Sequence, residues 1–137
     1  MGPLETRGLY LVSGFYWDQN DRTRAFSRRF NDVTSRMPDK PYAATYAAVG
    51  HFLRIVETAD TVDGVALNIG LRRESAYFFG ANGQFRVDGT LLLDVGLFRV
   101  KSPDQVTAPW DYYSPIRTIS ATDVYRPSSR ARCMLTP

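Results

Sequence analysis

Residues 39–56, DKPYAATYAAVGHFLRIV, are the stretch that decides the fold. Their large apolar side chains recur at alternating steps of four and three residues, a spacing that places them on one face of an α-helix. These side chains are Tyr42, Tyr46, Val49, Leu53 and Val56. A second stripe of small residues lies beside them and lets another backbone come close. We therefore expect a helix that is covered on much of its circumference, inside a layered domain.

Two elements are expected before this helix. Residues 8–16, GLYLVSGFY, are apolar and rich in β-formers, which predicts a strand buried on both faces of a parallel sheet. The run ends in the aromatic segment 15–18, at the carboxyl end of the strand, where α/β sheets hold ligands. A helix then follows, capped by Asn20 or Asp21 and ended by Pro38.

Shorter elements are expected after the central helix. Residues 61–71 suit a third helix capped by Thr61. Residues 85–100 predict a hairpin whose second arm, residues 91–100, is the longest strand. Turns are expected over residues 80–83, where Asn82-Gly83 is the strong signal, and at Asp88-Gly89.

The segment from residue 101 onward follows no periodic pattern, because prolines interrupt it repeatedly. We expect an irregular tail over residues 102–137, with one helical turn near residues 120–124. The aromatic run WDYY at residues 110–113 is expected to hold this tail against a surface.

Composition limits the classes of function. At 137 residues the chain is one domain or part of one. The net charge is +3, and the arginines of the chain are interspersed with acidic residues. The density of basic residues is therefore lower than in a nucleic-acid-binding stripe. No run of about 18 apolar residues is present, so no membrane-spanning helix is expected. A single cysteine, Cys133, excludes an internal disulfide framework and a site made of cysteines alone.

No catalytic, metal or cofactor site is predicted. The one histidine, His51, and Cys133 lie far apart in sequence, and no nucleophile, phosphate-loop or zinc motif is present. His51 lies off the apolar stripe and is expected to be solvated. Asp94 interrupts an apolar run, so we expect it to pair with an arginine or to bond a backbone group.

The predicted order is strand, helix, helix, short helix, hairpin and tail. A buried parallel strand needs neighbours on both sides, and this order supplies none for residues 8–16. We therefore expect either a piece of a larger α/β protein or a chain that completes its sheet with a second copy.

Several segments in this order resemble the type I periplasmic substrate-binding proteins of ABC transporters, of the branched-chain amino acid or amide-binding family. The resemblance lies in residues 8–17, the helix with Ala25, Phe26 and Phe30, the TYAAV of residues 45–49, and the hairpin over residues 85–100. It covers roughly the first hundred residues and extends only loosely to the tail.

The resemblance implies an α/β fold, a partial periplasmic-binding-protein-like (flavodoxin-like) lobe with hinge strands, two main helices and a C-terminal β-hairpin. In that family two lobes are joined by three crossings and hold a ligand between them. Residues 1–101 would be the C-terminal part of the two-lobed domain, and both main helices would lie in its first lobe. By position, the remaining face of the ligand cleft would comprise Tyr16, Trp17, Tyr42 and, more weakly, Tyr46. Packing within the core is the competing interpretation of both helix tyrosines.

The implied function is solute binding without catalysis. The solute would be an amino acid or a related small carboxylate, with the aromatic residues favouring a branched or aromatic side chain. A full-length protein would deliver it to a membrane permease from the periplasm, with a signal peptide outside these residues. As a fragment, the chain is expected to bind weakly or not at all, and to form a homodimer. Two alternatives stay open: a cytosolic ligand-sensing regulator of the same fold, and a basic nucleic-acid module.

Overall fold

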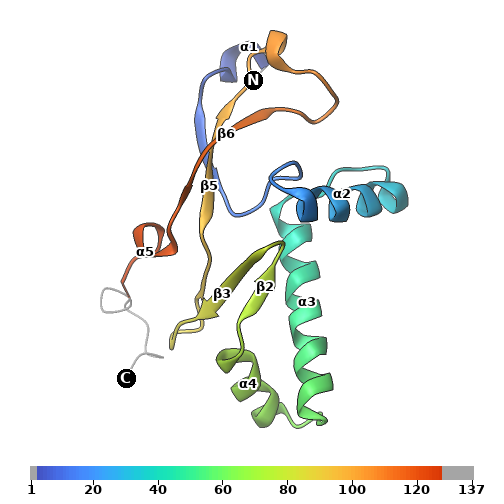
Figure 1. The fold of residues 1–137 in the computed structure, drawn as a ribbon, viewed down its shortest axis with the longest axis vertical. Coiled ribbons are helices and arrows are strands. Elements are labelled where there is room, and N and C mark those ends of the chain that lie inside the picture. Colours follow the sequence, from blue (N-terminus) through green and yellow to red (C-terminus); the bar gives the residue numbers. More distant parts are fainter. Residues whose placement is uncertain (1–2, 128–137) are drawn as a thin grey trace. The chain divides into compact units, whose positions relative to one another are not determined.

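The computed structural model describes residues 3–127 of the chain (Figure 1). Its elements are α1 (Pro3–Thr6), β1 (Tyr10–Ser13), α2 (Asp21–Thr34), α3 (Lys40–Ala59), α4 (Gly64–Arg73), β2 (Ala76–Phe78), β3 (Ala81–Phe85), β4 (Leu91–Leu92), β5 (Val95–Val100), the 3₁₀ turn η1 (Pro103–Gln105), β6 (Tyr113–Ile119) and α5 (Ala121–Val124). None of these helices is long and apolar enough to cross a membrane.

The described chain forms two compact units. Unit 1 comprises residues 3–40 and 95–119, and unit 2 comprises residues 41–94 and 120–127. The chain therefore passes from one unit to the other three times, after Lys40, Asp94 and Ile119. Each unit contains its own three-stranded sheet.

The sheet of unit 1 has the order β1-β5-β6, and both pairings are antiparallel. Tyr10 lies opposite Arg99, so β1 is joined to a strand from much later in the chain. The predicted parallel strand buried on both faces is therefore wrong. Tyr10 and Val12 are exposed while Leu11 and Ser13 are half-buried, which is the alternation of an antiparallel strand with one open face.

β6 was not predicted from the sequence, which suggested an irregular tail. It is an edge strand that contains Pro115, opposite Phe98 on β5. The register shifts between Leu97 and Phe98. A proline is tolerated at an edge or a bulge because it lacks only the ladder N–H, so its presence did not exclude a strand here.

Unit 2 contains α3, α4 and the small sheet β2-β3-β4. Its core includes Ile55 of α3 and Leu67 of α4, both nearly inaccessible to solvent. A Cβ at Gly70 would come within 2.7 Å of Ile55, so glycine at that position lets α4 approach α3 closely. The N-cap of α4 is Asp63 rather than the predicted Thr61.

The hairpin prediction holds in part. β3 pairs with β4 around the turn that includes Asp88 and Gly89, as the turn chemistry predicted. The predicted long strand over residues 91–100 is instead two strands, because β5 leaves this sheet and pairs with β1 and β6. Asp94 lies at the break and accepts a hydrogen bond of 2.8 Å from the Ala121 N–H, in agreement with the expected backbone bond.

The turn predicted over residues 80–83 lies earlier in the chain, and Asn82-Gly83 is not part of it. Both residues lie within β3, opposite Tyr77 and Ala76. The two-residue turn is Phe79-Gly80, with φ of 44° and 104°, and positive φ at both central positions is what a type I′ hairpin turn requires. The local signal of Asn-Gly was outweighed by the pairing of β2 with β3.

The central helix is confirmed but its buried face is not the predicted one. α3 runs from Lys40 to Ala59, close to the predicted range. The stripe expected to be covered is largely exposed: Tyr42, Tyr46, Val49 and Leu53 are each about half accessible. The residues of α3 buried within the structure are Ala43, His51 and Ile55. The expectation that His51 is solvated is therefore wrong.

The helix α2 begins as predicted and ends earlier. Asn20 is its N-cap, and its side chain accepts hydrogen bonds from the N–H groups of Arg22 and Thr23. The helix ends at Thr34, with Ser35 in a left-handed conformation, before Pro38 is reached. Its buried side packs Phe26 edge-on against Phe15, with ring centroids 6.0 Å apart. α2 thus belongs to unit 1 and α3 almost wholly to unit 2, whereas the resemblance implied one lobe for both.

Candidate functional site

A hollow of about 350 Å³ opens in unit 1 beside the sheet β1-β5-β6. Aromatic rings from three parts of the sequence dominate its lining: Tyr16 and Trp17 after β1, Phe98 on β5, and Trp110, Tyr112 and Tyr113 before or at the start of β6. The β1–β5–β6 pairing brings these segments together, because β5 lies between the other two strands.

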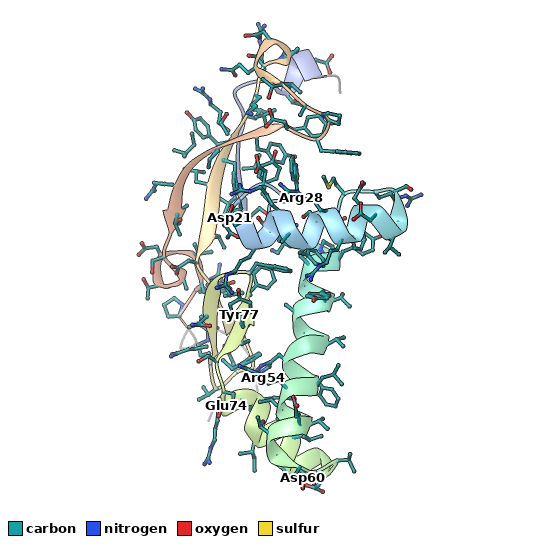
Figure 2. All side chains as sticks on the ribbon, turned by 45° about the vertical axis from the view of Figure 1, so that its right-hand side comes forward. Asp21, Arg28, Arg54, Asp60, Glu74 and Tyr77 are labelled. Carbon is teal, nitrogen blue, oxygen red and sulfur yellow. The ribbon has the colours of Figure 1, made fainter. Side chains whose placement is uncertain are left out.

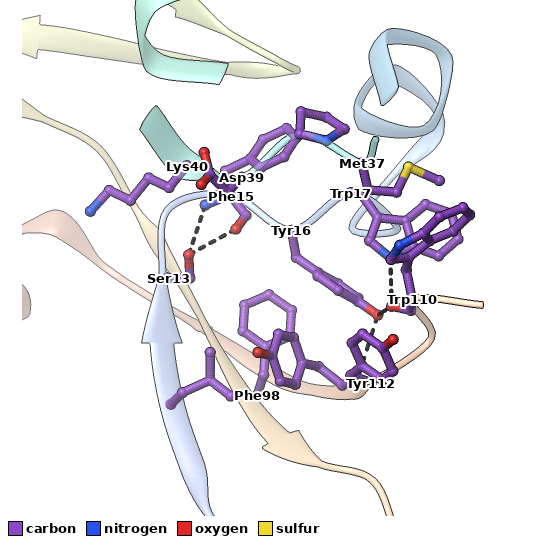
Figure 3. Close-up of a pocket in the computed structure, with 13 residues that line it drawn as sticks. Ser13, Phe15, Tyr16, Trp17, Met37, Asp39, Lys40, Phe98, Trp110 and Tyr112 are labelled. Atoms are coloured by element: carbon purple, nitrogen blue, oxygen red, sulfur yellow. Dashed lines mark hydrogen bonds between the residues drawn. The ribbon is translucent and has the colours of Figure 1, made fainter. Parts of the chain in front are cut away.

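The backbone carbonyl of Trp110 organises this cluster. It accepts hydrogen bonds from the Tyr16 hydroxyl at 3.1 Å and from the Trp17 Nε1 at 2.8 Å, and Figure 3 shows both side chains converging on it. The Tyr112 N–H donates to the same oxygen at 2.9 Å. Trp110 has a φ of 64°, a left-handed conformation that is unusual for a bulky residue.

Tyr16 is at the centre of the ring contacts. Its ring centroid lies 5.1 Å from that of Tyr113 and 5.5 Å from that of Phe98, distances typical of favourable aromatic pairs. Burial raises the pKa of the Tyr16 hydroxyl above its usual value, and the nearby Asp111 carboxylate adds to the effect. The hydroxyl therefore stays protonated and keeps donating to the Trp110 carbonyl.

Asp111 fixes the loop that carries Trp110. Its carboxylate is paired with the Lys101 ammonium and accepts hydrogen bonds from the Thr107 N–H at 3.2 Å and the Thr107 hydroxyl at 3.1 Å. The hydrogen bond from Lys101 is the main cause that lowers the pKa of Asp111. A buried carboxylate with this many donors holds its position firmly.

The lining of the hollow in unit 1 is mostly apolar, and two of its residues are charged. Asp39 and Lys40, at the start of α3, contribute opposite charges, and Ser13 contributes a hydroxyl that donates to the Phe15 carbonyl at 2.8 Å. An apolar concavity with a few placed polar groups is the usual form of a small-molecule site. The indole N–H of Trp17 and the hydroxyl of Tyr16 are already used by the Trp110 carbonyl, so these two residues offer the hollow mainly carbon surface.

A second concavity, an apolar groove of about 750 Å³, lies in unit 2. One wall is the stripe of α3 with Tyr46, Val49 and Leu53, and the other includes Tyr77 and Phe79. The rings of Tyr46 and Phe79 lie nearly parallel, with centroids 6.1 Å apart.

His51 and Arg54 also line this groove. The Arg54 guanidinium reaches from α3 toward β2 (Figure 2) and donates to the Ser75 carbonyl at 2.7 Å. It also lies 3.0 Å from the His51 Nδ1, while the His51 Nε2 lies 3.2 Å from the Leu71 carbonyl. A guanidinium can only donate and a carbonyl can only accept, so the neutral ring carries its proton on Nε2.

The four predicted ligand-binding residues are found in different places. Tyr16 and Trp17 line the hollow of unit 1, and Tyr46 lines the groove of unit 2. Tyr42 is half exposed on α3 and lines neither. The structure thus groups Tyr16 with Trp17 in unit 1 and leaves Tyr42 and Tyr46 in unit 2.

Sequence reasoning missed most of the partners of Tyr16 and Trp17. The sequence predicts only that the segment with Trp110, Tyr112 and Tyr113 holds the tail against a surface. That contact is present, since the Trp110 carbonyl bonds to both Tyr16 and Trp17. The density of aromatic residues in the two segments was the available signal, but nothing in the sequence indicated that β6 would bring them together.

Within residues 3–127, no three His, Cys, Asp or Glu side chains group so as to hold a metal ion. Cys133 lies outside the described residues.

Comparison with protein families agrees with this arrangement. A sequence profile described as periplasmic binding protein matches residues 1–105. The chain belongs to the periplasmic binding protein family. The resemblance stated from the sequence is thereby confirmed. A comparison with curated proteins finds no match.

Solved periplasmic binding proteins share the fold. One from Burkholderia mallei is 30% identical, with a TM-score of 0.92 over 99% of this chain. A branched-chain amino acid ABC transporter periplasmic ligand-binding protein from Burkholderia xenovorans is also 30% identical, with a TM-score of 0.90 over 98%. An amino acid ABC transporter substrate-binding protein from Pseudomonas fluorescens has a TM-score of 0.80 at 15% identity, a likeness of fold alone.

The chain spans 36% of the length of each Burkholderia protein. The fold is accordingly a partial periplasmic-binding-protein fold that combines helices with small antiparallel sheets. These relatives are binding proteins rather than enzymes, in agreement with the prediction of a binding protein.

Proposed function

We propose that this chain supplies part of the solute-binding site of a periplasmic receptor for an ABC transporter. The observation that carries the proposal is the hollow of unit 1, about 350 Å³ in volume, whose lining is dominated by aromatic rings. That volume is within the range of small-molecule sites. The name of one relative, the branched-chain amino acid ABC transporter periplasmic ligand-binding protein from Burkholderia xenovorans, and the three passages of the chain between its units support it.

The solute in this proposal is an amino acid or a related small carboxylate, with a preference for an aromatic side chain. Tyr16 and Trp17 would contact the apolar part of the solute. Asp39 and Lys40 carry the opposite charges that would suit an amine and a carboxylate. The ligand-contact roles of Tyr42 and Tyr46 stay predictions, as do delivery to a permease and a location in the periplasm.

The tryptophans of the chain can report solute binding through their fluorescence. Its two tryptophans are Trp17 and Trp110, and both line the hollow. Tryptophan emission therefore reports on the hollow and on no other part of the sequence.

The test is a titration of the chain with phenylalanine, leucine and benzoate, followed by tryptophan emission and by saturation-transfer NMR. We expect saturable binding of phenylalanine or benzoate near the millimolar range, which corresponds to about 4 kcal/mol, and weaker binding of leucine. Weak affinity is expected because the chain spans 36% of its relatives.

The variant Trp17→Leu should abolish the saturation-transfer NMR signal of the solute. Emission from Trp110 and circular dichroism verify that this variant is folded. The matched control is Val62→Glu, since Val62 is 86% exposed in unit 2; it should bind like the unmodified chain. Equal binding by Trp17→Leu, or no saturable signal from any of the three solutes, would contradict the proposal.

A further inference from the structure

Phe98 is a fixed part of the lining of the hollow in unit 1. It is 1% exposed, and its ring rests on the backbone of β5, since a Cβ added to Gly96 would overlap the ring. The ring also packs against those of Tyr16 and Tyr113, with centroids 5.5 and 6.4 Å away. A ring packed this closely has no space to move into when a larger solute enters the hollow.

The rings of Tyr16 and Trp17, which also line the hollow, are fixed by hydrogen bonds. The Trp17 Nε1 and the Tyr16 hydroxyl both donate to the Trp110 carbonyl, at 2.8 and 3.1 Å. A solute that displaced either ring would have to break one of these bonds, and that loss would count against its binding. The aromatic part of the lining therefore has a set shape.

Met37 gives the lining a side chain of a different kind. It lies between α2 and α3 and lines the same hollow (Figure 3). The backbone on either side of it is held, because the Ser35 N–H donates to the Asn31 carbonyl at 2.7 Å and Pro38 is buried. The side chain of Met37 is only half-buried, and an unbranched thioether changes rotamer readily and fills gaps of irregular shape.

A lining that combines fixed rings with an adaptable side chain accepts solutes of more than one size, because the adaptable side chain takes up the difference. We propose that Met37 is the specificity-determining residue of the hollow. It makes the hollow adaptable to small carboxylates whose aromatic groups differ in size, from a single ring to a fused pair. This inference rests on the proposed solute site of unit 1.

The test compares benzoate with naphthoate, which adds a second fused ring, by tryptophan emission and saturation-transfer NMR. The unmodified chain should bind the two acids with similar dissociation constants. Met37→Ile keeps an apolar side chain of similar size but adds a branch at Cβ, which makes χ1 stiff. This variant should weaken the binding of naphthoate relative to benzoate on the order of tenfold, the discrimination that small changes in an apolar pocket produce.

Met37→Ala tests the opposite change. It removes most of the side chain, so benzoate loses contacts that the second ring of naphthoate regains. The ratio of the two dissociation constants should shift in favour of naphthoate on the order of tenfold. A variant that merely loosened this segment would weaken the binding of both acids alike. Shifts of the ratio in opposite directions therefore separate a role in specificity from a structural role.

Val33→Ala is the matched control, because Val33 is 85% exposed on α2 in the same unit and does not line the hollow. It should leave the ratio of dissociation constants unchanged. Circular dichroism and tryptophan emission verify that each variant is folded. Since the two Met37 variants shift the ratio in opposite directions, one that fails to fold leaves the other as the test.

The outcomes distinguish this inference from the proposed function. If the unmodified chain binds neither acid, the solute site itself is contradicted, and the role of Met37 with it. If both acids bind and the ratio is the same in the unmodified chain and in the folded Met37 variants, the solute site stands and the role of Met37 is overturned. A strong preference of the unmodified chain for one of the two acids would overturn that role too.

Discussion

A single carbonyl oxygen, that of Trp110, joins the two aromatic segments of unit 1. Its donors come from Tyr16, Trp17 and Tyr112, so one carbonyl oxygen accepts three hydrogen bonds. The left-handed backbone of Trp110 costs about 1 kcal/mol or more. These hydrogen bonds offset that cost, and the position of the hollow depends on them.

Asp111, the next residue, is the one whose replacement should loosen this loop. Asp111→Asn removes the ion pair with Lys101 and weakens the bonds from Thr107. We expect the free energy of unfolding at neutral pH to fall by about 2 kcal/mol, measured by urea denaturation followed through tryptophan emission. Asp32→Asn, at an exposed position of α2, is the control and should change stability little.

The ion pair of Asp111 with Lys101 predicts that the free energy of unfolding depends on pH. Because the pKa of Asp111 is lowered by folding, its contribution is fully present above the pKa of an unfolded aspartate, about 3.9. It is lost as the pH falls through the lower pKa of the folded state. The difference between the unmodified chain and Asp111→Asn should therefore narrow below about pH 4. An equal difference at pH 3 and pH 7 would contradict this account.

At the scale of the element, α2 depends on its first turn. Asn20 accepts hydrogen bonds from the Arg22 and Thr23 N–H groups, and the Thr23 hydroxyl accepts one from the Asn20 N–H. Asn20→Ala should lower the free energy of unfolding by about 1 kcal/mol, measured by thermal denaturation. Arg29→Ala, at an exposed position of the same helix, should change it much less, and equal losses would argue against the cap.

The elements show how far sequence reasoning reached. Local chemistry predicted the start of α2 at Asn20 and the helix α3 closely, because caps and helical periodicity act within a few residues. It did not predict which face of α3 is buried. His51 contacts Leu71 of α4 and Phe85 of β3, and these contacts arise only when α4 and β3 pack against α3.

Pairing between distant strands was the other limit. The sequence suggested one buried parallel strand, whereas β1 lies antiparallel to β5. An alternating pattern indicates which side chains of a strand share a face, but it does not indicate which other strand pairs with it. For the candidate site, Tyr16 and Trp17 could be selected because they follow a strand, but Trp110 could not, since its place depends on β6.

At the scale of the whole molecule, two units with separate cores should unfold separately. Both tryptophans lie in unit 1, while unit 2 contains α4, of 10 residues, and nearly all of α3, of 20. We expect urea transitions followed by tryptophan emission and by far-ultraviolet circular dichroism to have different midpoints, because the two probes report mainly on different units. Coincident transitions would show instead that the chain unfolds as one cooperative body.

The pairing of Tyr10 with Arg99 has a consequence for synthesis on the ribosome. β1 leaves the exit tunnel long before β5, which is the strand it pairs with among residues 3–127. During that interval α3, α4 and the β2–β3 hairpin, which need only local contacts, can form on the nascent chain. Until Val100 has emerged, β1 therefore lacks the strand that it pairs with among residues 3–127.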